Sequence, residues 1–275
     1  VKDSVSQIKE DYAHLKGNVW NAVTDGKCDN KGLTDCTKIV QEAINNAKDC
    51  TVLYFPKGSY LFSNTITIKQ KKGLTIRGDG TEYYGTLFVA SCQYTFITFY
   101  GGQNLIIENL SIKGSDISTS RAIAFFDNTP TTMDCRTTET HIRHVKITRF
   151  ANGIEISCPS GYNYFDDVSV SMFPSSGAGF SVGTLYKNTG TTEAGDTILP
   201  NYIYFTNCKS DGSSQEFNID GLNIKCGQYI VVDKCDFCNM VNGVSIINNN
   251  TSSFVVNDVF INNTSLYNNK NGVSI

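Results

Sequence analysis

The sequence predicts an all-β solenoid, a stack of coils that are each built from short strands. A phrase of one apolar residue, two polar residues and an apolar alternation returns along the chain, and the three- and four-residue apolar spacing of helical repeats is missing after residue 50. Short repeats made only of strands are typical of a β-solenoid. The phrase begins at six anchors: Ile107, Ile142, Phe165, Phe205, Val232 and Val256.

A second phrase follows each first phrase and completes the coil. The anchors of the first phrase are separated by 35, 23, 40, 27 and 24 residues, so some coils carry insertions. We interpret the Asn or Asp before Gly in the second phrase, as in Asp220-Gly, as a maker of sharp bends, because these residues tolerate left-handed backbone angles. The second phrases occupy residues 122–125, 152–156, 178–182, 220–224, 242–246 and 271–275.

Equivalent residues of successive coils are expected to form columns, since stacked strands lie about 4.8 Å apart. The alternation within the first phrase places one such column inside the solenoid. Its cysteines are therefore predicted to be small buried hydrophobic residues. The column contains Leu110, Val145, Val168, Cys208, Cys235 and Val259.

Composition argues against several classes of function. The 275 residues carry a net charge of −3 without a basic cluster, which disfavours a nucleic-acid partner, and no apolar run is long enough to span a membrane. The ten cysteines form no dense disulfide framework. Cys235 and Cys238 are three residues apart and point to opposite faces of a strand, which disfavours zinc binding. We expect reduced, mostly buried thiols, no metal and no cofactor.

Residues 1–18 are predicted to form a short helix before the solenoid. Five apolar residues step by 4, 3, 4 and 3, the spacing of a coiled-coil seam: Val1, Val5, Ile8, Tyr12 and Leu15. Two heptads are too short to be stable alone, so the segment is expected either to cap the solenoid or to form a trimeric neck. Residues 19–275 form the solenoid domain. The chain starts at Val1 without a signal peptide and stops in mid-coil, so we expect a piece of a longer protein.

A second helix is predicted over residues 34–48, with Thr34 or Asp35 as its N-cap and an apolar face that includes Ile39, Val40 and Ile44. A strand over residues 51–55 follows it. This strand ends at the turn signal Pro56-Lys-Gly.

This region resembles the opening segment of the pectate lyase-like superfamily, which phage tailspikes and polygalacturonase-like enzymes share. The resemblance covers residues 19–80 and departs from the family in the stretch 27–32 and at Cys36. It implies a right-handed parallel β-helix plugged by the helix, with Asp25, Asp35 and Asp79 as turn or cap residues, and it implies no activity. The matching segments are Thr24-Asp-Gly, Gly32-Leu-Thr-Asp-Cys-Thr-Lys-Ile-Val-Gln-Glu-Ala-Ile, Val52-Leu-Tyr-Phe-Pro-Lys-Gly-Ser-Tyr-Leu and Gly73-Leu-Thr-Ile-Arg-Gly-Asp-Gly.

Glycan hydrolysis usually needs two carboxylates, about 5 to 5.5 Å apart for retention or about 6.5 to 9.5 Å apart for inversion. Positions one coil apart fall near the first range, and positions two coils apart fall near the second. The acids of the polygalacturonase family are missing here. The equivalent places hold Arg121-Ala122, Ala151-Asn152 and Gly177-Ala178-Gly179.

The only adjacent acid pair within the repeats is Asp166-Asp167. Asp167 is expected to be a turn residue. Asp166 shares an outward column with Glu108 and Arg143, and side chains of alternating sign there favour a modest surface ladder over a catalytic site.

Glu155 is the only carboxylate in an outward column that we expect to be an open shelf for a carbohydrate: Ala124, Glu155, Ser181, Asn223, Ser245 and Ser274. We hypothesise that Glu155 is one catalytic acid and that Asp127, Glu193 or Asp196 is the other; a solvated surface role is the alternative. The insertions at residues 113–139 and 184–200 are expected to be binding loops. The expected substrate-binding residues are Tyr162, Tyr186, Arg121 and Asn223.

Three functions fit these features. The first is a homotrimeric phage tail spike or fibre segment that binds, and can depolymerise, a bacterial surface polysaccharide, attached to other virion tail or baseplate proteins. The second is a structural or receptor-binding virion protein of the same fold without catalysis. The third is a secreted bacterial pectin-type lyase or glycoside hydrolase. The first reading places the protein in the virion tail, away from nucleic acid and membranes.

Overall fold

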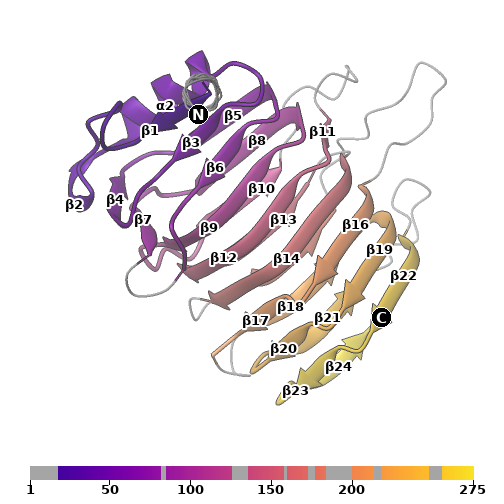
Figure 1. Ribbon diagram of the computed structural model, residues 1–275. Helices are drawn as coiled ribbons and strands as arrows, with labels where there is room; N and C mark the ends of the chain where they lie inside the picture. Colours follow the sequence, from indigo (N-terminus) through magenta and orange to yellow (C-terminus); the bar gives the residue numbers. More distant parts are fainter. Residues whose placement is uncertain are drawn as a thin grey trace, which may run out of the picture.

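The computed structural model describes residues 18–81, 85–125, 136–157, 160–172, 177–183, 200–213, 218–247 and 256–275. Within these ranges the strands pair in parallel with the strands of the next coil and wind into an elongated stack (Figure 1). The prediction of a parallel β-helix is therefore confirmed. The helix predicted over residues 1–18 lies outside the described residues, except for Asn18.

The coils form three faces, which we call A, B and C. Face A carries the second phrase and contains β5 (Ile66–Lys72), β8 (Thr95–Gln103), β10 (Arg121–Phe125), β13 (Asn152–Ile156), β15 (Gly177–Val182), β18 (Ile219–Ile224), β21 (Asn242–Ile246) and β24 (Asn271–Ser274). The short β11 (Thr137–Thr138) pairs with β8 and β14.

Face B carries the start of the first phrase and contains β1 (Val19–Asn21), β3 (Val52–Tyr54), β6 (Thr75–Arg77), β9 (Ile106–Lys113), β12 (His141–Phe150), β14 (Ser160–Met172), β16 (Asn201–Thr206), β19 (Gly227–Asp233) and β22 (Val256–Asn262). Strands β9, β12 and β14 continue around a corner into face C. The other members of face C are β2 (Lys31–Asp35), β4 (Gly58–Phe62), β7 (Thr86–Ala90), β17 (Lys209–Asp211), β20 (Asp236–Cys238) and β23 (Ser265–Tyr267).

The helix α2 (Thr37–Asn46) is shorter than the predicted 34–48 and covers the first coils at the N-terminal end (Figure 1). Asp35 Oδ1 accepts the backbone N–H of Thr37 at 3.0 Å, and Gln41 exchanges hydrogen bonds with both backbone groups of Thr67 on β5. These contacts satisfy polar groups at the helix start and tie the helix to the stack. They confirm the predicted capping helix, but its N-cap is Cys36 and not the predicted Thr34 or Asp35, because the helix begins later than predicted.

The corner between faces B and C is built from residues with left-handed backbone angles, as expected for Asp167, whose φ is 51°. Asn, Asp and Gly are favoured in this region because their short side chains or missing Cβ avoid the clash with the next carbonyl. Asp167 also accepts a hydrogen bond at 2.9 Å from His144, the corner residue of the previous coil. The corner residues in successive coils are Asn109, His144, Asp167, Asn207, Lys234 and Asn263.

The predicted register of the last coil is wrong by five residues. Val256 pairs with Gly227, and the true continuation of Val232 is Ile261. Two segments of this coil, which begin at Val256 and at Ile261, carry an apolar residue followed by two polar residues. Each segment contains a left-handed residue, with φ of 53° at Asp258 and 46° at Asn263. The sequence pattern alone does not show which segment continues Val232. As a result Val259 lies beside Ile230 and outside the predicted inward column.

The core is one continuous cluster of apolar side chains inside the coils. Phe165 and Phe205 stack in successive coils with ring centroids 5.0 Å apart. Cys208 and Cys235 are buried beside each other, and each thiol lies near a backbone carbonyl oxygen, so the prediction of buried, unbridged thiols holds for this pair. Over the described ranges, no helix has the length and apolar character that crossing a membrane would require.

Candidate functional site

The structure confirms the predicted outward column on face A. Glu155 pairs with Ala124 on one side and Ser181 on the other, and the column continues through Asn223 and Ser245. The expectation of an open shelf is wrong, because Glu155 and Ser181 are each only 8% exposed. Small side chains stacked one coil apart shield one another. The column is closed at Glu155 and becomes half-exposed at Asn223.

Glu155 is held by two partners. Its Oε2 pairs with the guanidinium of Arg121, which lies one coil earlier on β10, and its Oε1 accepts a hydrogen bond from the Ser157 hydroxyl at 2.7 Å. The guanidinium and the hydroxyl together fix the orientation of the carboxylate. The structure therefore brings together Glu155 and Arg121, two of the predicted site residues. Asp127, Glu193, Asp196 and Tyr186 lie outside the described residues.

A second acid on face A, Asp220, was interpreted from the sequence as a bend residue. It accepts hydrogen bonds from Asn242 at 2.7 Å and from Asn223, a predicted substrate-binding residue, also at 2.7 Å. Burial raises the pKa of Asp220, and the hydrogen bonds from the two amides offset this effect only in part. The raised pKa favours the protonated form of Asp220, which is the form that a general acid needs.

The interpretation of the Asn-Gly and Asp-Gly pairs as left-handed bends is wrong. Asp220 does not have a positive φ; its Gly221 is required because a Cβ there would lie 2.5 Å from the carbonyl oxygen of Gly243 in the next coil. The glycine also inserts an extra residue into the alternation, so that Asp220 and Asn223 both point outward while Ile219 and Leu222 are buried. One signal could have identified Asp220: it is the only carboxylate in its column of Arg121, Asn152, Ala178, Asp220, Asn242 and Asn271.

Asp220 lies two coils beyond Glu155, because β15 separates β13 from β18. Two strand spacings amount to about 9.6 Å along the stack. Asp220 also lies three residues before Asn223, which stands in the column of Glu155, so the backbones of the two acids are further apart than this. The spacing excludes the separation of about 5 Å used by retaining glycosidases, and it reaches the range used by inverting ones only where the two side chains extend toward each other. Asn223 stands in the column of Glu155, two coils further on, and donates a hydrogen bond to Asp220.

Tyrosines form an exposed ladder where face A turns into face B. Tyr162, Tyr202 and Tyr229 occupy equivalent positions in successive coils, with exposures of 47%, 37% and 38%. All three have left-handed backbones, with φ of 55°, 52° and 55°. The coils on either side of the three place Glu139 and Asp258 at this position. A bulky side chain in this conformation costs about 1 to 2 kcal/mol, a type of strain that often marks functional sites.

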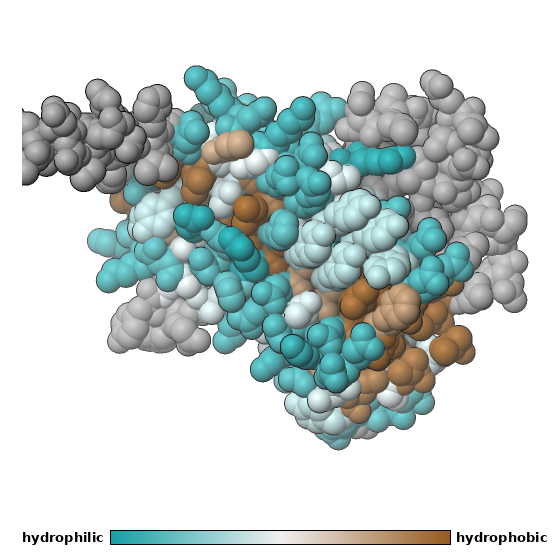
Figure 2. All heavy atoms as spheres, turned by 45° about the vertical axis from the view of Figure 1, so that its right-hand side comes forward, coloured by the Kyte–Doolittle hydropathy of each residue, from teal (hydrophilic) through white to brown (hydrophobic). Residues whose placement is uncertain are grey.

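The rings of Tyr162 and Tyr202 stack face to face, with centroids 4.7 Å apart and planes 3° apart. One face of the Tyr162 ring is therefore covered by its neighbour, and the role predicted for Tyr162 in sugar stacking remains a prediction. Figure 2 shows pale and brown side chains gathered on the lower right of this view, against a largely hydrophilic surface.

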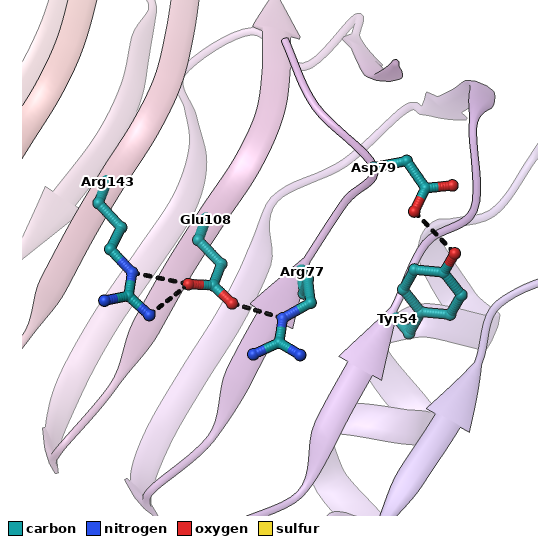
Figure 3. A network of polar contacts seen from close by, with 5 residues as sticks. All are labelled: Tyr54, Arg77, Asp79, Glu108 and Arg143. Atoms are coloured by element: carbon teal, nitrogen blue, oxygen red, sulfur yellow. Dashed lines mark hydrogen bonds and ion pairs between the residues drawn. The ribbon is translucent and has the colours of Figure 1, made fainter. Parts of the chain in front are cut away.

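The predicted charge ladder on face B exists, with different members. Glu108 is 3% exposed and lies between the guanidinium groups of Arg77 and Arg143 (Figure 3). Burial by itself would raise the pKa of Glu108, but the hydrogen bonds from the two arginines outweigh it and the pKa is lowered. Asp166, expected in the ladder, instead accepts a hydrogen bond from Asn207 at 3.1 Å. This ladder is structural.

The aspartates expected in turns behave as predicted. Asp79 accepts hydrogen bonds from the Tyr54 hydroxyl at 2.7 Å (Figure 3) and from the backbone N–H of Lys57 at 2.8 Å. Asp25 accepts the backbone N–H of Asn21 at 2.8 Å. Both oxygens of Asp79 are thus used to hold the chain between two strands.

A family model described as "Rhamnogalacturonase A/epimerase, pectate lyase-like" matches residues 20–274. No curated protein matches. Among solved structures, the chain is similar to the N-terminal fragment of bacteriophage Phi29 gene product 12 (TM-score 0.62, 12% identity, 99% of this chain and 45% of that chain). It is also similar to the Dettilon tailspike protein (TM-score 0.55, 12% identity, 89% and 50%).

A third similar structure is the catalytic unit of an α-1,3-glucanase from Streptomyces thermodiastaticus (TM-score 0.51, 18% identity, 88% of this chain and 46% of that chain). At these identities the likeness shows the fold. The chain spans about half the length of each of these three proteins.

Proposed function

Because the chain belongs to the rhamnogalacturonase A/epimerase, pectate lyase-like family, we propose that it binds a polysaccharide along face A and hydrolyses it. We place it in a phage tail spike or fibre that is directed at a bacterial surface polysaccharide, with a virion tail location and attachment to other tail or baseplate proteins. The likeness to the Dettilon tailspike protein supports this assignment.

The observation that carries the proposed chemistry is the environment of Asp220. Its pKa is raised by burial, so the carboxyl group can donate a proton to the oxygen of the scissile glycosidic bond. Asn223 and Asn242 orient the group, and their amides offer further hydrogen-bonding capacity to sugar hydroxyls. Glu155, oriented by Arg121 and Ser157, is the base that activates water from the other side of the sugar.

The experiment compares the wild type with Asp220→Asn and Glu155→Gln on the purified surface polysaccharide of the host. Release of reducing ends by the wild type and loss of this release in Asp220→Asn would support hydrolysis at face A. Unsaturated uronate absorbance would show lyase chemistry instead and would remove Asp220 from its assigned role. Full activity in Glu155→Gln would exclude Glu155 and leave the second acid elsewhere.

A second candidate function is a receptor-binding virion protein that holds the glycan without cleaving it. The surroundings of Glu155 favour it, because the residue is only 8% exposed and its two oxygens are already engaged by Arg121 and Ser157. Binding of the polysaccharide without any new reducing ends or uronate absorbance would establish this function.

A further inference from the structure

A hollow of about 970 Å³ lies on face C, away from Glu155 and Asp220. It spans four successive coils, since its walls come from β4, β7, β9 and β12 and from the turns before them. We call it the lysine groove. Its main polar lining residues are Lys57, Ser59, Thr86, Ser111, Lys113 and Lys146.

The groove is positively charged. Three of its lining residues are lysines, and none of the lining residues within the described ranges is acidic. Lys57, Lys113 and Lys146 form no ion pair with any residue that the structure describes. Asp79 accepts the backbone N–H of Lys57, and both of its oxygens are already engaged, by Tyr54 and by that N–H. Among the described residues, the three ammonium groups therefore have no acidic partner.

The register sets the spacing of the cations. Lys146 pairs with Ser111, and Lys113, two residues further along β9, pairs with Thr148. Two lysines on adjacent strands with a two-residue offset lie about 8 Å apart at their Cα atoms. Lys57 adds a third charge two coils earlier, just before Ser59 of β4. A ligand with several anionic groups along an extended chain would fit this row.

The lining chemistry selects the ligand class. Ammonium groups act as point charges for carboxylates. The hydroxyls of Ser59 and Thr148 in the groove can bond to sugar hydroxyls, whereas the Thr86 hydroxyl is already engaged by backbone groups. A neutral sugar would favour an aromatic platform, and the described lining residues include no aromatic side chain. Nucleic acid is disfavoured by the net charge of −3 of the whole chain.

We propose that the lysine groove is a non-catalytic binding site for an acidic polysaccharide, one that bears carboxylate groups on successive sugars. The inference rests on the proposed function in taking the ligand to be a glycan. It adds that the glycan is anionic and that it is anchored on a face other than the one that cleaves it. The groove would hold the polymer on the spike while face A acts on another part of it.

The test is calorimetric titration with a hexamer of galacturonic acid and with the same hexamer after reduction of its carboxyl groups. The double variant Lys113→Gln/Lys146→Gln should bind the acidic hexamer roughly tenfold more weakly or worse, because two charge-assisted contacts are lost. The matched control Lys69→Gln/Lys72→Gln removes two exposed lysines of β5 and should bind like the wild type. Circular dichroism checks that both variants are folded.

Equal binding of the reduced hexamer, or equal weakening in both double variants, would overturn the proposal. The competing outcome is that the wild type binds single-stranded DNA more tightly than the acidic hexamer. If only Lys113→Gln/Lys146→Gln lost this DNA binding, the proposal would be overturned in favour of a nucleic-acid site. Asp220→Asn should bind the acidic hexamer like the wild type. Asp220→Asn is thus expected to lose cleavage and keep binding, whereas Lys113→Gln/Lys146→Gln is expected to lose binding and keep cleavage. These opposite results distinguish the two sites.

Discussion

At the scale of single residues, environment rather than residue type separates the acids of this protein. Glu108 and Glu155 are both buried and paired with arginines, but Glu108 has one on each side, whereas Glu155 has one and a hydrogen bond from Ser157. The hydrogen-bond donors to Asp220 are the neutral amides of Asn223 and Asn242, and burial outweighs them and raises its pKa. This combination makes Asp220 the strongest candidate for proton transfer.

We predict that Asp220→Asn stabilises the fold increasingly as the pH rises. The raised pKa means that the folded state holds its proton in a range where the unfolded state has lost it, so the wild type loses stability between about pH 4, the ordinary value, and the folded pKa. Asp220→Asn has no titratable group at this position, so it does not lose this stability as the pH rises. Asn223 can turn its amide so that its unpaired Oδ1 accepts from the new amide.

Thermal unfolding across this pH range measures the effect, with the exposed Asp258→Asn as the control. The melting temperature of Asp220→Asn relative to the wild type should rise through the window and level off above the folded pKa. A difference that stays constant with pH would show that Asp220 titrates normally.

The sequence predicted part of this site. The period-2 alternation places Glu155, Ser181 and Asn223 in one column, and the structure agrees. Asp220 was missed because Asp-Gly has two physical meanings, a left-handed bend or a close approach of coils, and the choice depends on the neighbouring coil. The closure of the column around Glu155 could not be predicted either, because the Arg121 contact joins residues 34 positions apart.

At the scale of the elements, the strands of face A are held together by a column of glycines. The backbone of the next coil packs closely against Gly221. A Cβ at this position would lie 2.5 Å from the Gly243 carbonyl oxygen and 2.8 Å from Phe237 Cβ. At the equivalent Gly272, the nearest atom would be 3.9 Å away. The two positions share a sequence motif and differ in packing.

We predict that Gly221→Ala lowers the free energy of unfolding by about 1 to 3 kcal/mol, because the added methyl group overpacks the contact between coils. Gly272→Ala is the matched control and should be close to neutral. Urea unfolding of the two variants checks this. Equal effects would mean that the glycines act through backbone entropy in the unfolded chain and not through close packing.

At the scale of the whole molecule, the β-helix separates three surfaces along one rigid stack. The acids of face A, the tyrosine ladder at the corner of faces A and B, and the lysine groove of face C come from different sides of the coils. A solenoid keeps such surfaces at fixed spacing because each coil contacts only its neighbours. The fold was predictable because its repeat is local; the groove was not, since it is assembled from four coils.

The heptad seam in residues 1–18 leads us to predict that three copies assemble. Analytical ultracentrifugation of residues 1–275 should give a trimer, and a chain that starts at residue 19 should dissociate toward monomer as it is diluted, since the seam supplies the apolar contacts. A monomer for residues 1–275 at all concentrations would assign the seam to a capping role within one chain.

The central claim, that Asp220 and Glu155 act on a glycan across two coils, is tested most directly by the anomeric configuration of the first product. Proton NMR during the first minutes of polysaccharide cleavage resolves it before mutarotation. Glu155 and Asp220 lie two strand spacings apart and are offset by three residues along the strand, which is too far for Glu155 to attack the sugar directly. A water molecule must then fit between the base and the sugar, which predicts a product with inverted configuration. A product with retained configuration requires two carboxylates about 5 Å apart and would contradict the account.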